Sequence, residues 1–466
     1  MKDSTNKQAR LKIDKRIFRA YDIRGIVKTE LSPDIVYLIG KAFATKAVRS
    51  SQPEMVVGRD GRLSSSTLRD ALVSGLIDAG INVVDVGLVP TPILYYATNK
   101  LGLGTGIMIT GSHNPPEYNG LKMMIAGNTL AGNEIAELYE SIVNGDLLNG
   151  SGTAGSLALD IKYEEEIKKD ITLERKIKVV VDCGNGAASN IAPRLLEGLG
   201  CEVIPLYCKV DGTFPNHHPD PADPNTLKDL KNTVLQHEAD IGIAFDGDGD
   251  RIGVVTEKGA IIWPDRLMML FAESIISRHP ATPIIYDVKC SRNLEKVIEN
   301  KGGVAIMCKT GHSHIKAKMK ETGALLGGEF SGHICIAERW LPFDDAIYAS
   351  ARLIELLSKE DCALSDIFAN YPSTHNTPEI KIPTTEDKKF AIIDRLSRAG
   401  GFEGGKISTI DGVRVDYDDG WGLIRASNTS PVLTLRFEGE NEAALERIKK
   451  VFQSRLSNIE PNLTFL

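Results

Sequence analysis

The densest group of chemically useful side chains is the run FDGDGDR, which directly follows an apolar, strand-like segment. Asp246, Asp248 and Asp250 alternate there with Gly247 and Gly249. Three carboxylates this close repel one another unless protons or a cation offset their charge, and glycine permits the tight backbone angles that let them converge. Oxygen-only ligands suit a hard cation, so the run predicts a Mg²⁺ site. A solvated acidic turn is the alternative, and the distal spacing of an EF-hand is missing.

A serine lies at the end of a second strand-like run, in the segment TGSHNPPEYNG. Ser112 stands there between Gly111 and His113, and two prolines follow closely. Such a loop exposes one hydroxyl group at a strand end, where a nucleophile is useful. The segment does not match G-x-S-x-G, so a hydrolase elbow is not supported. An ordinary Gly/Pro turn is the alternative, and we expect His113 to have a structural role.

Two further polar loops offer groups that can bind sugar-like hydroxyls in one case and a phosphate in the other. In GEFSGH, Glu329 and Ser331 can bind hydroxyl groups, and His333 can transfer protons near neutral pH. The run RASNTSP offers a guanidinium, two hydroxyl groups and an amide, which suit a phosphate dianion: Arg425, Ser427, Asn428 and Thr429. An ordinary turn or helix cap remains the alternative for each loop. The P-loop and dinucleotide-binding fingerprints are both missing.

The elements that must position these loops follow a repeated order. Apolar strand-like runs alternate with helical stretches in three successive blocks, and each block places a polar, Gly-containing loop after a strand. From about residue 374 a period of two predicts an antiparallel sheet with one face open to solvent, followed by an amphipathic helix. We therefore expect an α/β protein with three similar mixed-sheet α/β domains and a C-terminal α+β domain around a central cleft. The predicted domain ranges are 1–154, 155–257, 258–373 and 374–466.

Composition limits the class of protein. The 466 residues carry 55 Lys and Arg against 62 Asp and Glu, a net charge of −7, which excludes nucleic-acid binding through overall positive charge. No apolar run reaches the roughly 20 residues that span a bilayer, and the polar start of the chain does not read as a signal peptide. The seven cysteines form no C-x-x-C pair and indicate reduced thiols. We expect a monomeric cytoplasmic protein with no nucleic-acid or membrane partner.

Taken together, the four loops resemble those of the α-D-phosphohexomutase superfamily, and within it the bacterial phosphomannomutase/phosphoglucomutase group. The resemblance extends from IFRAYDIRG near the start to RASNTSP near the end, and the pair TGSHNPP and DGDGDR is its most specific part. It implies that Ser112 is phosphorylated and is the phosphoryl donor. It also implies that Asp246, Asp248 and Asp250 hold Mg²⁺ together with an oxygen of the phosphate on Ser112.

The resemblance implies roles for the other residues as well. Glu329 and Ser331 match the residues that hold the 3- and 4-hydroxyls of the sugar, and Arg251 can contact the phosphoserine. The site for the non-reacting phosphate is matched by Arg425, Ser427, Asn428 and Thr429. Further active-site positions are matched by Tyr21, Arg24, Lys122, Lys289, His312 and His333. Lys122 and His333 are the candidates for general acid and base, with Arg24 lowering the relevant pKa values.

The implied reaction consists of two phosphoryl transfers. Phosphoserine phosphorylates a hexose 1-phosphate of mannose or glucose, and the bound 1,6-bisphosphate turns over and returns its other phosphate to the serine. Glucose 1,6-bisphosphate, or its mannose equivalent, would then be the activator. RASNTSP differs from the Gly-Thr-Glu-Pro style loop typical of phosphoglucosamine mutases, which favours neutral hexoses. A phosphoglucosamine mutase, a Mg²⁺-dependent sugar phosphatase and a non-catalytic sugar-phosphate sensor are the alternatives.

Overall fold

The computed structural model describes residues 13–428 and 430–465. The chain divides into two compact units: unit 1 holds residues 1–88 and 97–158, and unit 2 holds residues 89–96 and 159–466. Within the described residues, no helix is both long enough and apolar enough to cross a membrane.

Unit 1 is built on one mixed sheet with the order β1-β5-β4-β2-β3-β7, and β6 pairs with β5. Strands β3 and β4 run parallel to β2, whereas β5 is antiparallel to both β4 and β1. The strands are β1 (Ile23–Ile26), β2 (Glu54–Arg59), β3 (Asn82–Leu88), β4 (Gly106–Ile109), β5 (Tyr118–Ile125), β6 (Asn128–Thr129) and β7 (Ala154–Ser156). The strand-like runs of the first predicted block are thus confirmed as strands of one sheet.

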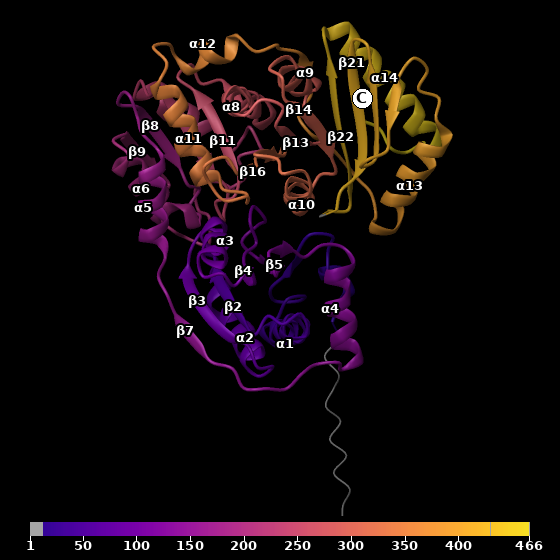
Figure 1. Ribbon diagram of the computed structural model, residues 1–466. Coiled ribbons are helices and arrows are strands. Elements are labelled where there is room, and N and C mark those ends of the chain that lie inside the picture. The colour runs from indigo at the N-terminus through magenta and orange to yellow at the C-terminus, as the bar shows by residue number, and fades with distance from the viewer. Residues whose placement is uncertain (1–12, 429, 466) are drawn as a thin grey trace, which may run out of the picture. The chain divides into compact units, whose positions relative to one another are not determined.

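Helices α1 (Pro33–Arg49) and α2 (Ser65–Ile77) pack closely on one another in unit 1 (Figure 1). Ser32 caps α1, because its hydroxyl accepts a hydrogen bond from the backbone N–H of Ile35, as the Ser-Pro start predicts. The helices touch at Gly75, where an added Cβ would lie 2.2 Å from the carbonyl oxygen of Tyr37. Only glycine allows this approach. Unit 1 also holds α4 (Asn133–Asn144), whereas α3 (Thr91–Lys100) begins among the residues of unit 2 and ends among those of unit 1.

Unit 2 contains three sheets. The first has the order β12-β11-β10-β8-β9 and the second has the order β14-β13-β15-β16. Their strands are β8 (Lys178–Asp182), β9 (Glu202–Leu206), β10 (Ile241–Phe245), β11 (Ile252–Thr256), β12 (Ile261–Ile262), β13 (Pro283–Asp287), β14 (Val304–Cys308), β15 (Leu326–Gly328) and β16 (Ile334–Ile336). The accompanying helices are α5 (Asp160–Asp170), α6 (Ala192–Gly198), α7 (Lys228–Gln236), α8 (Pro264–Arg278), α9 (Arg292–Asn300), α10 (His312–Thr322), α11 (Ala346–Ser358) and α12 (Leu364–Ala369).

These two sheets and the sheet of unit 1 share one topology. In each, a central strand (β2, β8 or β13) is parallel to both of its neighbours, one of which (β4, β10 or β15) turns back into an antiparallel strand (β5, β11 or β16). The three turn-back loops carry Ser112, the three aspartates and Glu329 respectively. The prediction of three similar mixed-sheet α/β blocks is therefore confirmed, and chemically distinct loops occupy equivalent places in them.

The last sheet of unit 2 is entirely antiparallel, with the order β17-β22-β21-β20-β19, and β18 pairs with β22. Its strands are β17 (His375–Asn376), β18 (Ile380–Pro383), β19 (Lys406–Ser408), β20 (Val413–Tyr417), β21 (Gly420–Ala426) and β22 (Val432–Gly439). Helices α13 (Glu386–Ala399) and α14 (Glu442–Ile459) lie on one of its faces (Figure 1). The predicted C-terminal helix is confirmed by α14, which Asn441 caps.

The expectation of a solvent-open face on this last sheet was wrong. Trp421 and Leu423 on that face are buried against Val288, which follows β13. The polar residues of the alternating pattern include Arg414 and Arg436, and both side chains are buried. A period of two shows that the two faces differ, but polar residues can be buried when they find partners in a neighbouring sheet.

The four domain ranges stay predictions. The boundary after residue 154 falls inside β7, and the boundary after residue 257 precedes β12, which pairs with β11. The boundary after residue 373 lies just before β17.

Candidate functional site

Ser112 lies in the loop between β4 and β5 of unit 1 and is only 1% exposed. Its backbone φ is +48°, a left-handed conformation that is strained for a residue with a Cβ. The backbone N–H of Ser112 donates to the hydroxyl of Thr110 at 2.8 Å, and its Oγ lies 3.3 Å from Nδ1 of His113. The loop therefore presents the serine in one defined orientation.

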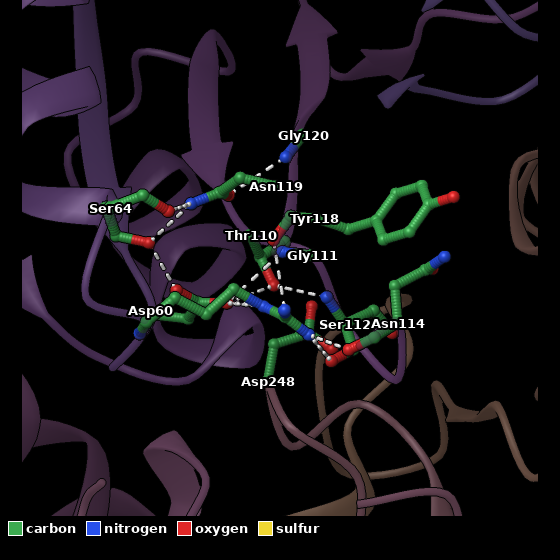
Figure 2. A network of polar contacts seen from close by, with 12 residues as sticks. Asp60, Ser64, Thr110, Gly111, Ser112, Asn114, Tyr118, Asn119, Gly120 and Asp248 are labelled. Carbon is green, nitrogen blue, oxygen red and sulfur yellow. Dashed lines mark hydrogen bonds and ion pairs between the residues drawn. The ribbon is translucent and has the colours of Figure 1, made fainter. Parts of the chain in front are cut away.

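Side chains around the serine loop form a polar network (Figure 2). The carboxylate of Asp60 accepts hydrogen bonds from the hydroxyl of Thr110 at 2.8 Å and from the N–H of Gly111 at 3.2 Å. Arg24 on β1 donates to the carbonyl oxygen of Gly111 at 3.1 Å and also to the Asn114 side chain. The predicted site residue Arg24 thus contacts the serine loop directly.

Lys122 and Tyr21 are the other two predicted site residues that belong to unit 1. Lys122 is buried on β5, where it is paired with Met108 of β4. Tyr21 is half-buried and precedes β1. Ser112, Arg24, Lys122 and Tyr21 therefore belong to unit 1, and the remaining predicted residues belong to unit 2.

The predicted metal loop is the run FDGDGDR (245–251). Its three aspartates are fully buried, and one carboxylate oxygen of each lies within 4.8 Å of those of the other two. Asp246 accepts from the backbone N–H groups of Asp250 and Arg251, whereas Asp248 accepts from the hydroxyl of Thr91. Buried carboxylates gathered at this spacing fit a hard divalent cation, so the donor set agrees with the predicted Mg²⁺. A neighbouring group of Asp250, His333 and Asp344 also meets this spacing.

The loop after β15 lies directly beside the metal loop. Nδ1 of His333 is 2.8 Å from Oε2 of Glu329, and its Nε2 is 3.3 Å from Oδ1 of Asp250. Burial alone would lower the pKa of His333, but the carboxylates of Asp250 and Glu329 outweigh it, despite Arg251, and raise the pKa to about 9. Burial opposes ionisation of Glu329, but His333 and Lys289 hold its pKa below the usual range.

Contacts to the other predicted residues extend this group. The rings of His312 and His333 stack at 5.4 Å, and Nδ1 of His312 lies 3.5 Å from Asp344. Nε of Arg251 is 3.3 Å from Nε2 of His333. Ser331 Oγ is 3.1 Å from Nδ1 of His333. The structure thus brings together the metal loop, the loop around Glu329 and the start of α10.

Two positively charged side chains lie near the start of the predicted phosphate loop (425–431), which begins at the end of β21. Arg425 at the end of β21 donates to Asp411 at 2.9 Å, and Nζ of Lys289 lies 3.2 Å from Glu379. Burial alone would lower the pKa of Lys289, but Glu379 and Asp287 outweigh it and raise the pKa, so the ammonium group stays charged. These two positive groups can attract a phosphate dianion.

Ser427 and Asn428 also belong to the predicted phosphate loop, the run RASNTSP (425–431). Ser427 is buried, and its hydroxyl accepts from the N–H of Ser430 at 3.2 Å. Asn428 is half-buried, and Thr429 lies outside the described residues.

Models of one family match four successive stretches of the chain between residues 15 and 453. The descriptions are phosphoglucomutase/phosphomannomutase alpha/beta/alpha domain I over residues 15–148, domain II over 161–259, domain III over 263–374, and C-terminal domain over 379–453. The chain belongs to the phosphoglucomutase/phosphomannomutase family. The resemblance predicted from the four loops is therefore confirmed, together with the predicted fold class.

Individual members of the phosphoglucomutase/phosphomannomutase family are similar over almost their whole length. A phosphomannomutase/phosphoglucomutase of Pseudomonas putida is 55% identical over 447 residues, which is 96% of each chain. A phosphoglucomutase of Neisseria meningitidis is 49% identical and covers 97% of this chain and 98% of its own. A solved structure of a phosphoglucomutase/phosphomannomutase family protein from Burkholderia thailandensis has a TM-score of 0.93 at 46% identity, covering 97% of this chain and 100% of its own.

Several residues of this family member contact the predicted site residues but were missed from the sequence. Asp411 binds Arg425 and also accepts from the N–H of Thr310, and Glu379 pairs with Lys289. No local pattern marks Asp411 or Glu379, because their partners are distant in sequence. Asp60 and Arg62 did leave a signal, the charged run GRDGR at the end of a strand-like segment.

Proposed function

We propose that this protein interconverts the 1-phosphates and 6-phosphates of mannose and glucose through two phosphoryl transfers at Ser112. One observation carries the proposal: the chain holds both a buried serine in a strained, hydrogen-bonded loop and three converging, fully buried carboxylates, in topologically equivalent loops. A phosphatase that used the aspartate loop alone would not need the serine. The relatives' names, phosphomannomutase/phosphoglucomutase and phosphoglucomutase, support this choice of sugars.

In the first proposed transfer, the bond between Ser112 Oγ and phosphorus breaks while the free hydroxyl oxygen of a hexose 1-phosphate bonds to the same phosphorus. The hydroxyl proton passes to a base, for which Lys122 and His333 are the candidates. After the bound 1,6-bisphosphate has turned over, Ser112 Oγ bonds to the phosphorus at C1 while the bond between that phosphorus and the sugar O1 breaks. The base returns the proton to O1, and the hexose 6-phosphate leaves. Positioning and electrostatic stabilisation supply most of the acceleration in such transfers.

Asp246, Asp248 and Asp250 are the residues proposed to hold Mg²⁺. As the family resemblance implies, the proposed ligand set also includes an oxygen of the phosphate carried by Ser112. A bound Mg²⁺ would offset the negative charge of the transferring phosphoryl group. The acidic loop supports this assignment through its all-oxygen donor set and its complete burial.

The substrate is proposed to bind through separate groups at its two ends. Arg425, Ser427, Asn428 and Thr429 are assigned to the non-reacting phosphate, with Lys289 adding positive charge. Glu329 and Ser331 are assigned to the sugar hydroxyls, and His312, Arg251 and Tyr21 to further contacts. Because the phosphate-binding site and the metal site are fixed while the bisphosphorylated sugar turns over, one set of side chains can serve both transfers. Glucose 1,6-bisphosphate, or the mannose equivalent, is the proposed activator.

The first prediction concerns Ser112→Ala. We expect conversion of glucose 1-phosphate to glucose 6-phosphate, with Mg²⁺ and a trace of glucose 1,6-bisphosphate, to fall by at least about 10³-fold, because the covalent acceptor is lost. A coupled dehydrogenase assay measures the product, and intact-protein mass measures the phosphate on wild-type Ser112. Ser74→Ala, which removes an exposed hydroxyl from α2, is the matched control and should retain full activity.

Parallel assays separate the alternatives. Glucose, mannose and glucosamine 1-phosphates are compared as substrates, and free phosphate is measured in each reaction. Faster turnover of glucosamine 1-phosphate would favour a phosphoglucosamine mutase. Phosphate release without isomerisation would replace the proposal with a phosphatase, and ligand binding with no turnover would indicate a sensor.

A further inference from the structure

Arg62 lies in the β2–α2 loop of unit 1 and is not among the residues assigned above. We propose that Arg62 is a positioning residue for phosphoryl transfer: its guanidinium group binds the carbonyl oxygens of the serine loop and holds Ser112 in its left-handed backbone conformation. The inference rests on the proposed role of Ser112 as the phosphoryl carrier.

The contacts of Arg62 are concentrated on one loop. Nη1 donates to the carbonyl oxygens of Pro115 at 2.6 Å and Tyr118 at 3.0 Å. Nη2 donates to the carbonyl oxygens of Ser112 at 2.7 Å and Asn114 at 2.5 Å. The side chain of Arg62 is 0% exposed. One planar group thus binds four carbonyls within seven residues, which the single point charge of a lysine could not do.

The same guanidinium explains why a glycine precedes Ser112. A Cβ added to Gly111 would lie 2.5 Å from both Cζ and Nε of Arg62. The guanidinium therefore covers the Gly111 backbone at a distance that leaves no room for a side chain. Ser112 then adopts φ +48°, a strained conformation that persists only where surrounding contacts hold it. Hydrogen bonds from a charged donor are stronger than those between neutral groups and can supply that stabilisation.

Asp60 balances the charge of Arg62 and fixes it to the loop after β2. Oδ2 of Asp60 lies 3.2 Å from Nε of Arg62, and its Oδ1 accepts from the backbone N–H of Arg62 at 3.0 Å. Asp60 also accepts from the hydroxyl of Ser65 at the start of α2, and Asn119 on β5 donates to that hydroxyl and to that of Ser64 (Figure 2). The serine loop is thus held by elements that flank it on both sides.

The loop after β13 in the third block corresponds to the loop after β2 that carries Asp60 and Arg62. Comparing the two loops shows which contacts are particular to the serine loop. Asp287 ends β13 and accepts from the N–H of Phe330 in the turn-back loop, much as Asp60 accepts from Gly111. Two residues later the third block has Lys289, whose ammonium group faces Glu379 instead of loop carbonyls. An arginine that donates hydrogen bonds to the turn-back loop is therefore a feature of the block that carries the proposed nucleophile. The shared sheet topology does not require such an arginine, since the third block has Lys289 in that place.

Removing the guanidinium should disturb transfer more than substrate binding. In Arg62→Met and Arg62→Lys, the residues proposed to bind the sugar and its distal phosphate, which belong to unit 2, are unchanged. We therefore expect kcat to fall about 100-fold in Arg62→Met, the scale on which a displacement of about 1 Å acts. KM for glucose 1-phosphate should stay within about threefold. Arg62→Lys should recover part of kcat, because it keeps the charge but not the four contacts.

The test compares these variants with Arg352→Met. Arg352 on α11 is also fully buried and binds Glu338, but it has no proposed role in the site, so its loss measures destabilisation alone. Steady-state kinetics are measured well below each melting temperature, and single-turnover transfer from phosphorylated protein to glucose 1-phosphate is followed by intact mass. Unchanged kcat in both Arg62 variants, or a loss no greater than that in Arg352→Met, would overturn the proposal.

A second measurement does not depend on activity or on Arg62→Met folding. Hydrogen exchange of peptides covering residues 106–120 is compared between wild type and Arg62→Lys, with α4 peptides as the internal reference. We expect faster exchange in Arg62→Lys than in wild type, confined to the serine loop. Identical exchange in the two proteins would refute the proposal that Arg62 holds this loop. If wild-type Ser112 takes no phosphate from glucose 1,6-bisphosphate, the proposed function fails, whereas the exchange result still decides whether Arg62 holds the loop.

Discussion

At the scale of single residues, each carboxylate of the metal loop is held by a different element. Asp246 accepts from two N–H groups of its own loop, and Asp248 accepts from Thr91 at the start of α3. Asp250 lies against His333 after β15. Because different parts of unit 2 hold the three groups, the loop keeps its spacing only while all of these parts are in place. Precise spacing matters for Mg²⁺, which demands near-octahedral geometry.

Asp248→Asn should weaken metal binding without removing the loop. One of three anionic ligands becomes neutral, so we expect the Mg²⁺ concentration for half-maximal activity to rise at least about tenfold. The rise in melting temperature on adding Mg²⁺ should shrink in parallel, since a ligand stabilises by RT ln(1 + [L]/Kd). Thermal unfolding across a Mg²⁺ series measures both proteins. Asp394→Asn, on the exposed surface of α13, is the control, and an unchanged Mg²⁺ response in Asp248→Asn would contradict the assignment.

At the scale of elements, buried ion pairs tie helices to one another. Glu338, which follows β16, accepts from Arg278 on α8 at 2.6 Å and from Arg352 on α11 at 2.7 Å. Burial by itself would raise the pKa of Glu338, but the two guanidinium groups outweigh it and lower the pKa to about 2. The carboxylate therefore links two helices that are distant in sequence, since α8 ends at residue 278 and α11 begins at residue 346.

This low pKa predicts a pH-dependent contribution to stability. A carboxylate whose pKa is lower in the folded state stabilises fully above its unfolded pKa of about 4.5, and the contribution disappears as the pH falls toward 2. We expect Glu338→Gln to lower the free energy of unfolding at pH 7 by roughly 1.5–3 kcal/mol, the scale of a hydrogen bond to a charged group, because the neutral amide loses the charge-assisted bonds to the two guanidinium groups. The difference from wild type should shrink steadily below pH 4.5. Urea unfolding across pH measures it.

Glu321→Gln is the control for this pH effect. Glu321 pairs with Lys318 on the exposed surface of α10, so its removal should change stability little at any pH. A Glu338→Gln deficit that stayed constant from pH 7 to pH 3 would show that shape, and not ionisation, is what the glutamate contributes.

At the scale of the whole molecule, unit 2 joins its last sheet to the third block through arginines on the sheet face. Arg414 donates to the carbonyl oxygens of Val288 and Cys290, and Arg436 donates to that of Lys289. Arg436 also pairs with Asp265 at 3.0 Å and lies over the ring of Phe330. The backbone that carries the proposed phosphate-binding Lys289 is thus held from the neighbouring sheet.

Arg436→Met should therefore affect substrate binding. We expect KM for glucose 1-phosphate to rise about tenfold, equivalent to about 1.4 kcal/mol, with a smaller change in kcat, because the Lys289 backbone loses a partner. The matched control is Arg447→Met, which removes a half-exposed arginine paired with Asp419. Steady-state kinetics of both variants test this, and an unchanged KM in Arg436→Met would show that Lys289 is positioned by its own block.

The sequence by itself determined the features that depend on near neighbours in the chain. The three aspartates and their glycines lie within five positions, so their convergence follows from local backbone freedom. The same holds for the Ser112 loop, for the capped start of α1 and for the strand–helix alternation of three blocks. These patterns were enough to predict the family, the fold class and most of the candidate site.

Only the tertiary structure decided the contacts between distant positions. The hydrogen bond from Arg62 to Ser112 joins residues that are 50 positions apart in sequence, and the bond between Thr310 and Asp411 joins residues that are 101 apart. The burial of the face of the last sheet opposite α13 and α14 involves arginines that donate to carbonyl groups in the segment after β13. Periodicity records which side chains share a face, but it does not say what covers that face. Charged side chains that look solvated in the sequence can therefore turn out to be the ones that hold the loops of the candidate site.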